Sequence, residues 1–255
     1  MSFTKIAIRV TINTVYESYG GGRVKLLVRN LCKKYDEVTI IGNASYTFEQ
    51  GRVYAVLGAA KSGKTTFLDC IGREATPDSG SIILDNGSKA KKADYSDFGF
   101  VTKEPLLMEY MTGREYVRYC LKLHDSGEEK IDEYFAMLGM GEDTLDMMIR
   151  EYTFGEKQAL QMIVIMAVNS PVILMDEPFV CNNKAAVKRF ISSMKPEHII
   201  IMTADSLESV REVSDEFLTI NHGAVEGFTA SALDDDNIQK RIESITTENG
   251  EEENA

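Results

Sequence analysis

The 255-residue sequence is short of the side chains that build metal clamps and disulfide frameworks. It has four cysteines without CxxC spacing and three histidines, which stand far apart in the chain. These numbers argue against a zinc site and against disulfides, so we expect the cysteines to be small buried hydrophobic residues. Positive charge is also scarce, since 28 Lys and Arg face 40 Asp and Glu and leave a net charge of −12. We therefore expect no nucleic-acid partner, because duplex binding needs a basic stripe.

Long apolar runs are missing as well. The best stretch, residues 162–168, is far below the roughly 18 to 20 residues that a membrane-spanning helix needs. The N-terminal segment MSFTKIAIRVTINT is interrupted by Arg9 and lacks the continuous apolar core of a signal peptide. We therefore expect a cytoplasmic protein, or the cytoplasmic part of a larger assembly.

Strand-like and helix-like stretches alternate along the chain, which favours an α/β architecture with a largely parallel sheet. From residue 112 to about 166 the hydrophobic period becomes helical, with segments at 130–140 and 156–168. From Asp234 the sequence turns polar and acidic, so we expect a frayed tail with little apolar surface to bury. The expected strands are 6–11, 24–28, 37–41, 53–57, 172–175 and 198–202, followed by a hairpin of 217–220 and 224–228.

The strongest motif is GAAKSGKT at 58–65, which fits the phosphate-loop pattern GxxxxGK[ST] between a strand and a helical stretch. In such a loop the backbone N–H groups point inward as an anion nest, and the helix N-terminus adds its positive end. Lys64 would reach the β- and γ-phosphates, and the Thr65 hydroxyl would ligate Mg²⁺. The alternative is an ordinary glycine turn that opens a helix. The expected nucleotide-binding residues are Gly58, Ala59, Ala60, Lys61, Ser62, Gly63, Lys64, Thr65 and Thr66.

Two acids follow the apolar strand VILM, where charges are costly unless they meet a cation or a reacting water. Asp176 suits a partner of Mg²⁺, and Glu177 suits a base that polarises the attacking water. Taken alone, the pair could equally be the solvated end of an ordinary strand. Together with the phosphate loop it predicts a site for nucleotide hydrolysis.

These motifs resemble those of the nucleotide-binding subunit of ATP-binding-cassette (ABC) transporters. The resemblance runs from about residue 24 to 227 and includes LGAAKSGKTT, VILMDEP and the closing hairpin LTINHGAVEGF. It implies a P-loop NTPase fold, with a RecA-like α/β core, an antiparallel β subdomain and a helical subdomain inserted at about 104–168. We expect this domain to cover 1–232, with an acidic, disordered tail at 233–255. By the resemblance, Tyr35 stacks on adenine; without it, Tyr35 is an exposed tyrosine at a strand edge.

Two motif segments depart from the family pattern. The glutamine that touches Mg²⁺ and the attacking water is replaced by Lys103, which we expect to point away from the metal or to contact phosphate. The signature LSGGQ appears as YTFGE. It keeps Thr153 and Gly155 as contacts for the nucleotide of a second cassette, but puts Phe154 where glycine lets the backbone approach the γ-phosphate.

Two further positions are altered, with Asn183 in place of the D-loop acid and Ala204 in place of the switch histidine. In the family, two cassettes pair head to tail, and each site combines one phosphate loop with the signature of the other cassette. Loss of one transition-state contact lowers a rate by about 10²-fold. We therefore expect ATP and Mg²⁺ to bind and hydrolysis to be slow, in a homodimer or a heterodimer.

We interpret the chain as the ATP-hydrolysing subunit of an ABC transporter, which couples MgATP binding and dimerisation to a separate polytopic membrane permease at the inner face of the membrane. The segment 103–115 is the expected coupling surface, although its apolar residues could simply pack the helical insert. The alternative is a regulatory or structural protein that is gated by nucleotide and hardly hydrolyses it; Glu177 argues against this. A ribosome- or DNA-linked role is disfavoured by the pI near 4.8. The sequence does not identify the transported substance, because in such systems the membrane subunit selects it, and both import and export are compatible with the sequence.

Overall fold

The computed structural model describes residues 23–123, 130–179, 184–221 and 223–247, and its centre is a six-stranded sheet ordered β10-β9-β3-β8-β7-β6. Neighbouring strands run parallel except β10, which pairs antiparallel with β9. Strands β7 and β8 are buried along their whole lengths, as expected of a parallel sheet covered on both faces. The strands are β3 (Arg52–Leu57), β6 (Phe98–Val101), β7 (Val172–Met175), β8 (Ile199–Ala204), β9 (Glu216–Asn221) and β10 (Ala224–Thr229).

A second, antiparallel sheet of four strands packs against one face of the central sheet. Helix α2 (Lys64–Ile71) joins the two, because its Phe67 and Leu68 share a buried cluster with Leu26 of β1 and Tyr54 of β3. The strand order is β2-β1-β4-β5. The strands are β1 (Lys25–Tyr35), β2 (Val38–Glu49), β4 (Ser79–Asp85) and β5 (Ala90–Lys92).

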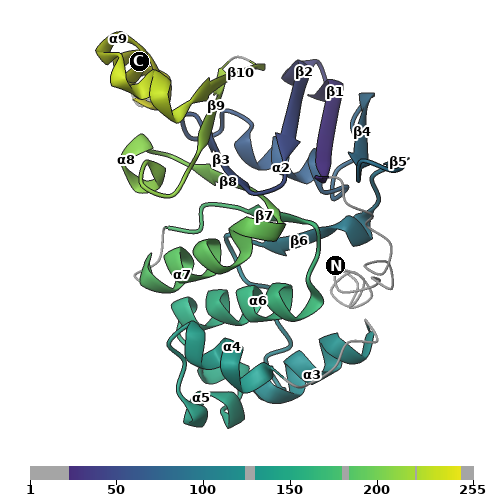
Figure 1. Cartoon of the computed structure of the whole chain (residues 1–255), viewed down its shortest axis with the longest axis vertical. Helices are drawn as coiled ribbons and strands as arrows, with labels where there is room; N and C mark the ends of the chain where they lie inside the picture. The colour runs from purple at the N-terminus through teal and green to yellow at the C-terminus, as the bar shows by residue number, and fades with distance from the viewer. Residues whose placement is uncertain (1–22, 124–129, 180–183, 222, 248–255) are drawn as a thin grey trace.

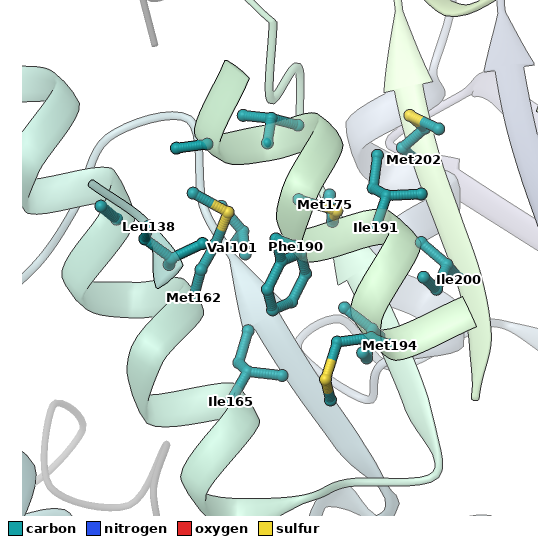
Figure 2. Packing of buried hydrophobic residues seen from close by; sticks show 14 of the residues in the cluster. Val101, Leu138, Met162, Ile165, Met175, Phe190, Ile191, Met194, Ile200 and Met202 are labelled. Carbon is teal, nitrogen blue, oxygen red and sulfur yellow. The ribbon is translucent and has the colours of Figure 1, made fainter. Parts of the chain in front are cut away.

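Helices gather at the opposite end of the molecule from the antiparallel sheet (Figure 1). They are α3 (Gly113–Leu123), α4 (Ile131–Met137), α5 (Glu142–Asp146), α6 (Phe154–Val168) and α7 (Lys184–Met194). A second buried cluster joins them to the other face of the central sheet, with Ile165 of α6, Phe190 of α7 and Met202 of β8 among its members (Figure 2). The shorter elements are η2 (Tyr95–Asp97), η3 (Ile149–Glu151), η4 (Lys195–Glu197), α8 (Leu207–Val210) and η5 (Ala230–Asp234).

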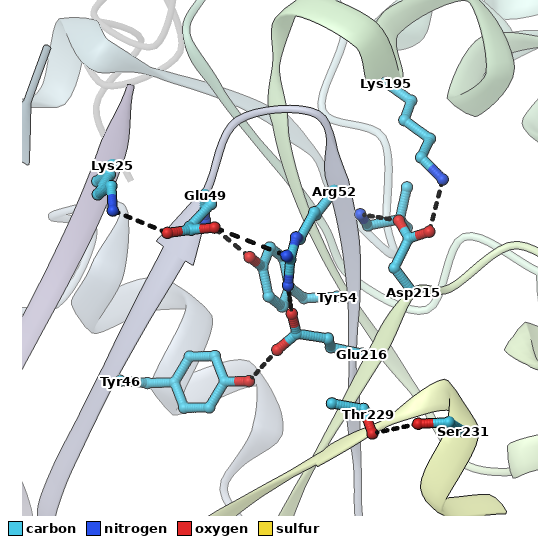
Figure 3. A network of polar contacts seen from close by, with 11 residues as sticks. Lys25, Tyr46, Glu49, Arg52, Tyr54, Lys195, Asp215, Glu216, Thr229 and Ser231 are labelled. Carbon is cyan, nitrogen blue, oxygen red and sulfur yellow. Dashed lines mark hydrogen bonds and ion pairs between the residues drawn. The ribbon is translucent and has the colours of Figure 1, made fainter. Parts of the chain in front are cut away.

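A polar network fastens the antiparallel sheet to the central one (Figure 3). Glu216 of β9 forms an ion pair with Arg52 of β3 and accepts a hydrogen bond from the Tyr46 hydroxyl of β2. Arg52 also lies 3.8 Å from the Glu49 carboxylate of β2. Burial and Glu216 raise the pKa of Tyr46, so its hydroxyl remains a donor. Gly227 of β10 gives the Tyr46 ring its room, because a Cβ there would lie 2.4 Å from the ring.

The predicted fold class is confirmed, although several elements have other bounds. Strand β2 continues to Glu49, and α6 begins at Phe154, two residues earlier than predicted. The region 104–168 holds the helices α3 to α6. The predicted strand at 6–11 lies outside the described residues. In the described part of the chain, no helix has the length and apolar character that crossing a bilayer demands.

The end of the chain differs from the prediction. Helix α9 (Asp236–Thr247) packs against β3 and β9, where Ile242 is fully buried and Ile245 nearly so. The prediction of a disordered tail over 233–255 is therefore wrong for 236–247, while 248–255 lie outside the described residues. The helix forms because Ile238, Ile242 and Ile245 recur at i, i+4 and i+7, and this spacing gives an otherwise polar segment one apolar face.

We predict that Ile242→Ala lowers the free energy of unfolding by roughly 2 to 4 kcal/mol, because it deletes buried side-chain atoms and leaves a cavity. Urea unfolding followed by circular dichroism measures this change. The control is Lys240→Ala on the exposed side of α9, which should stay within about 0.5 kcal/mol of wild type. Equal, small effects of both variants would show that α9 adds nothing to stability.

Candidate functional site

The phosphate loop connects β3 to α2 in a tight turn. Gly63 has φ 103° just before α2, and a Cβ there would lie 2.7 Å from the Ile40 side chain of β2. Glycine is therefore required for the backbone conformation and for the close approach to the antiparallel sheet. Lys61 also has positive φ, so the loop curls tightly before α2 begins. The Ser62 hydroxyl is buried and has no hydrogen-bond partner among the described residues.

Lys64 is buried at the base of this loop, with 5% of its surface exposed. Its ammonium donates to the carbonyl oxygens of Gly58 at 2.7 Å and Ala59 at 2.8 Å. It also forms an ion pair with the Asp205 carboxylate at 2.9 Å. An ammonium group has three N–H donors, so these three acceptors match its full capacity.

The carboxyl ends of the parallel strands bring three further side chains together. Asp176 follows β7, and its carboxylate oxygens each lie 3.2 Å from the Thr65 hydroxyl at the start of α2. Thr203 of β8 donates to Asp176 Oδ1 at 2.6 Å. The same Thr203 hydroxyl accepts the backbone N–H of Glu177 at 2.9 Å. The Asp176 carboxylate and the Thr65 hydroxyl thus place adjacent oxygen atoms where they could ligate a metal ion.

Glu177 faces Lys103 directly. The Lys103 ammonium lies 2.6 Å from Glu177 Oε2, and the Glu177 side chain is only 10% exposed. Contact with this carboxylate raises the pKa of Lys103 above its ordinary value. The partner of Lys103 in this structure is Glu177, a contact that the sequence does not predict. Glu177 itself has φ 46°, a strained backbone conformation for a non-glycine residue.

A hollow of about 180 Å³ lies beside Glu177. Ala204 lines this hollow, and a side chain larger than its methyl group would project into it. The remaining lining residues are Phe179, Thr203, Asp205, Ser206 and Ser209. Four of these five residues carry a side-chain oxygen, although most of the surface that lines the hollow is apolar.

The donor set suits Mg²⁺ better than a transition metal. Among the described residues, no group of three or more His, Cys, Asp or Glu side chains could hold a metal ion. Mg²⁺ instead binds through one or two carboxylates together with phosphates and water. The hard oxygens of Thr65 and Asp176 fit this pattern, and the unpartnered Ser62 hydroxyl is a further group that a phosphate could use.

The other predicted residues lie apart from this centre. Tyr35 is at the tip of the β1–β2 hairpin, half exposed, with the Lys33 ammonium 4.9 Å from its ring centroid. Thr153 and Gly155 stand at the start of α6, where Thr153 and Glu156 cap the helix reciprocally. Phe154 is 46% exposed beside them. The position of Asn183 lies outside the described residues.

Asp205 and Thr203 are absent from the residues predicted from the sequence. Thr203 carried a signal, since it is a hydroxyl residue within the apolar strand Ile199–Ala204. Asp205 carried little sequence signal, because a single acidic residue after a strand is common. Its pairing with Lys64 joins residues 141 positions apart in the sequence and follows only from the strand order.

His198 does not take part in the site. It precedes β8, at the opposite end of that strand from Ala204, and is buried. Its Nδ1 lies 2.6 Å from the Met194 carbonyl oxygen, and its Nε2 lies 2.9 Å from Asn169 Oδ1. These contacts tie the end of α7 to the residue that ends α6. His124 and His222 lie outside the described residues.

The sequence is similar to ATP-binding proteins of transport systems. The family model described as "ABC transporter" matches residues 41–180. The sulfate/thiosulfate import ATP-binding protein CysA of Synechococcus elongatus is 28% identical over 218 residues, covering 80% of this chain and 62% of that protein. The lantibiotic transport ATP-binding protein SrtF of Streptococcus pyogenes is 27% identical over 198 residues, covering 76% of this chain and 85% of that protein. This chain thus spans less than two thirds of the length of the first relative.

Solved structures share the fold. A structure titled as the ATP binding subunit of an ABC transporter superposes with a TM-score of 0.75, at 17% identity, over 87% of this chain and 99% of that one. A bacterial Atm1-family ABC exporter with ATP bound gives a TM-score of 0.71 at 18% identity, over 88% of this chain and 42% of that one.

We predict that acidification below about pH 6.5 destabilises the protein through His198. Burial lowers its pKa in the folded state, so the unfolded chain binds more protons and stability falls as the pH drops below 6.5, the ordinary value. Thermal unfolding of wild type and His198→Gln at pH 7.5 and 5.5 measures the effect. The variant should be less stable at pH 7.5 by about 1 kcal/mol, and should lose less stability on acidification than wild type. Parallel losses in the two proteins would contradict the assignment.

Proposed function

The chain belongs to the ABC transporter family, and on that premise we propose that it is the ATP-binding subunit of such a transporter. The observation that carries this proposal is the meeting of Lys64, Thr65 and Asp176 at the carboxyl ends of parallel strands. A glycine-bearing loop before a helix, a buried lysine and a paired carboxylate form a polyphosphate site. The relatives CysA and SrtF are both named ATP-binding proteins of transport systems.

Each part of the site has a proposed role toward MgATP. The loop from Gly58 to Thr66 surrounds the phosphates, with Lys64 as the cation among them, and Tyr35 stacks on the adenine. Thr65 and Asp176 hold Mg²⁺, which neutralises phosphate charge when bound. Glu177 then orients and deprotonates the attacking water.

We propose slow hydrolysis, because three features oppose it. The Lys103 ammonium forms an ion pair with the Glu177 carboxylate, and this contact competes with the binding of a water molecule by Glu177. Phe154 stands exposed where the partner's phosphate would approach. Ala204, at the position of the switch histidine, has no side chain that could contact phosphate, and a hollow lies there beside Glu177. Each missing contact costs about 10²-fold in rate, so turnover falls far below that of an intact ATPase.

The proposed partners are a second cassette and a polytopic membrane permease. Thr153 and Gly155 would serve the nucleotide of the second cassette, in a homodimer or a heterodimer. The permease would contact the exposed side of 103–115, where Tyr110 is 84% exposed and Leu106 is 57% exposed. Leu107, Met108 and Met111 of the same segment pack against the core instead. This arrangement would place the chain on the cytoplasmic, inner face of a membrane.

A second candidate function is a nucleotide-gated regulatory or structural subunit with little or no ATPase activity. The Lys103–Glu177 ion pair favours it, because the candidate base is already neutralised by a cation at 2.6 Å. Binding and dimerisation would then be the functional events.

We predict that purified protein binds MgATP, and that Lys64→Ala weakens this binding at least about 10-fold because a buried cation is lost from the phosphate site. Equilibrium binding of a fluorescent ATP analogue and a phosphate-release assay measure the two activities. Glu177→Gln should keep the affinity and lose the release of phosphate. Lys122→Ala, an exposed position on α3, is the control for loss of a positive charge. Equal binding by Lys64→Ala and wild type would refute nucleotide binding at this loop.

We further predict that Lys103→Gln speeds phosphate release by about 10-fold, because it frees the Glu177 carboxylate to act as a base. The double variant Lys103→Gln/Glu177→Gln should return to background, which shows that the gain passes through Glu177. Lys122→Gln removes the same charge elsewhere and should leave the rate unchanged. Slower release by Lys103→Gln would mean that the lysine serves phosphate rather than restraining Glu177.

A further inference from the structure

Two of the lysines at the candidate phosphate site, Lys64 and Lys103, form ion pairs with carboxylates of the chain itself. Lys103 pairs with Glu177 at 2.6 Å, and Lys64 pairs with Asp205 at 2.9 Å. Asp205 also contributes to the electrostatic environment that raises the pKa of Lys103, so its charge is felt by both cations. The chain's own carboxylates thus place negative charge beside the lysines that a polyphosphate would contact.

The Lys64 ammonium cannot gain a phosphate oxygen without losing one of its three acceptors. Two of them, the carbonyl oxygens of Gly58 and Ala59, belong to the tightly curled backbone of the loop. The third is the Asp205 side chain, which is 56% exposed and can rotate into solvent, where its carboxylate is hydrated. Of the three acceptors, the Asp205 carboxylate is therefore the one that a phosphate oxygen replaces at the lowest free-energy cost.

We propose that Asp205 competes with the phosphates of the nucleotide for Lys64, and so sets the affinity of the site. Its carboxylate is the anionic partner of the buried Lys64 ammonium. A polyphosphate displaces the carboxylate, and Asp205 then remains nearby as a like charge that opposes binding. This role rests on the proposed function, because it requires that the loop binds a nucleotide.

The position of Asp205 also predicts which part of the ligand it affects. Its partner is Lys64, so competition concerns phosphate groups and not the base. Removal of its charge should therefore strengthen binding of MgATP, MgADP and pyrophosphate to similar extents. Asp205 lies directly after β8, so Asp205→Asn keeps the size of the side chain and leaves the strand untouched.

The test compares wild type, Asp205→Asn and Glu208→Gln by isothermal titration with MgATP, MgADP and pyrophosphate. Glu208 is exposed on α8, three residues further on, and its loss changes the net charge equally. We expect Asp205→Asn to bind all three ligands about 10-fold more tightly than wild type, as for the loss of one like charge in a partly solvated site. Glu208→Gln should change each affinity less than about 2-fold.

Equal affinities of wild type and Asp205→Asn would overturn the proposal while leaving nucleotide binding intact. Weaker binding by Asp205→Asn would also overturn it, because Asp205 would then assist the ligand or its metal. Binding by Asp205→Asn and none by wild type would support it in its strongest form. If neither protein binds any of the three ligands, and Lys64→Ala behaves the same, the proposed function fails and this inference fails with it.

Discussion

The site depends on one constraint, the parallel pairing of β3, β8 and β7. Parallel strands end on the same edge of a sheet, so the loop after β3, Thr203 and Asp205 at the end of β8, and the acids after β7 must meet there. Leu57 pairs with Ala204 and Met175 with Met202, which sets how far each strand projects. A slip of this register would separate Thr65 from Asp176 and Lys64 from Asp205.

The fold and half of the site could be predicted because their signals are local. The phosphate loop is a contiguous motif between a strand and a helix, and the apolar run before Asp176 and Glu177 marks a buried strand. Helix α9 was also signalled locally, by three isoleucines at helical spacing. The acidic composition of the segment predicts a frayed tail, but the apolar face that these isoleucines form is enough to fold it as a helix.

The ion pairs could not be predicted, because they depend on tertiary geometry. The contact of Lys103 with Glu177 joins the end of β6 to the end of β7 and depends on the direction of two side chains. Lys64 begins the helix after β3 and Asp205 follows β8, so the two residues are brought together by strands that are neighbours in the sheet and distant in the chain. Substitution of a family glutamine by lysine at position 103 indicated altered chemistry without indicating which residue the lysine would contact.

The capping of α6 has a consequence for association. The Thr153 hydroxyl accepts the backbone N–H of Glu156, while the Glu156 carboxylate accepts the N–H of Thr153, so these two N–H groups at the helix start are bonded within one chain. Binding to another molecule normally includes an entropic cost for ordering the segments that meet it. Here that ordering is completed during folding of the single chain. Assembly through this surface would therefore begin from a preorganised helix end, with the ring of Phe154 already presented to solvent.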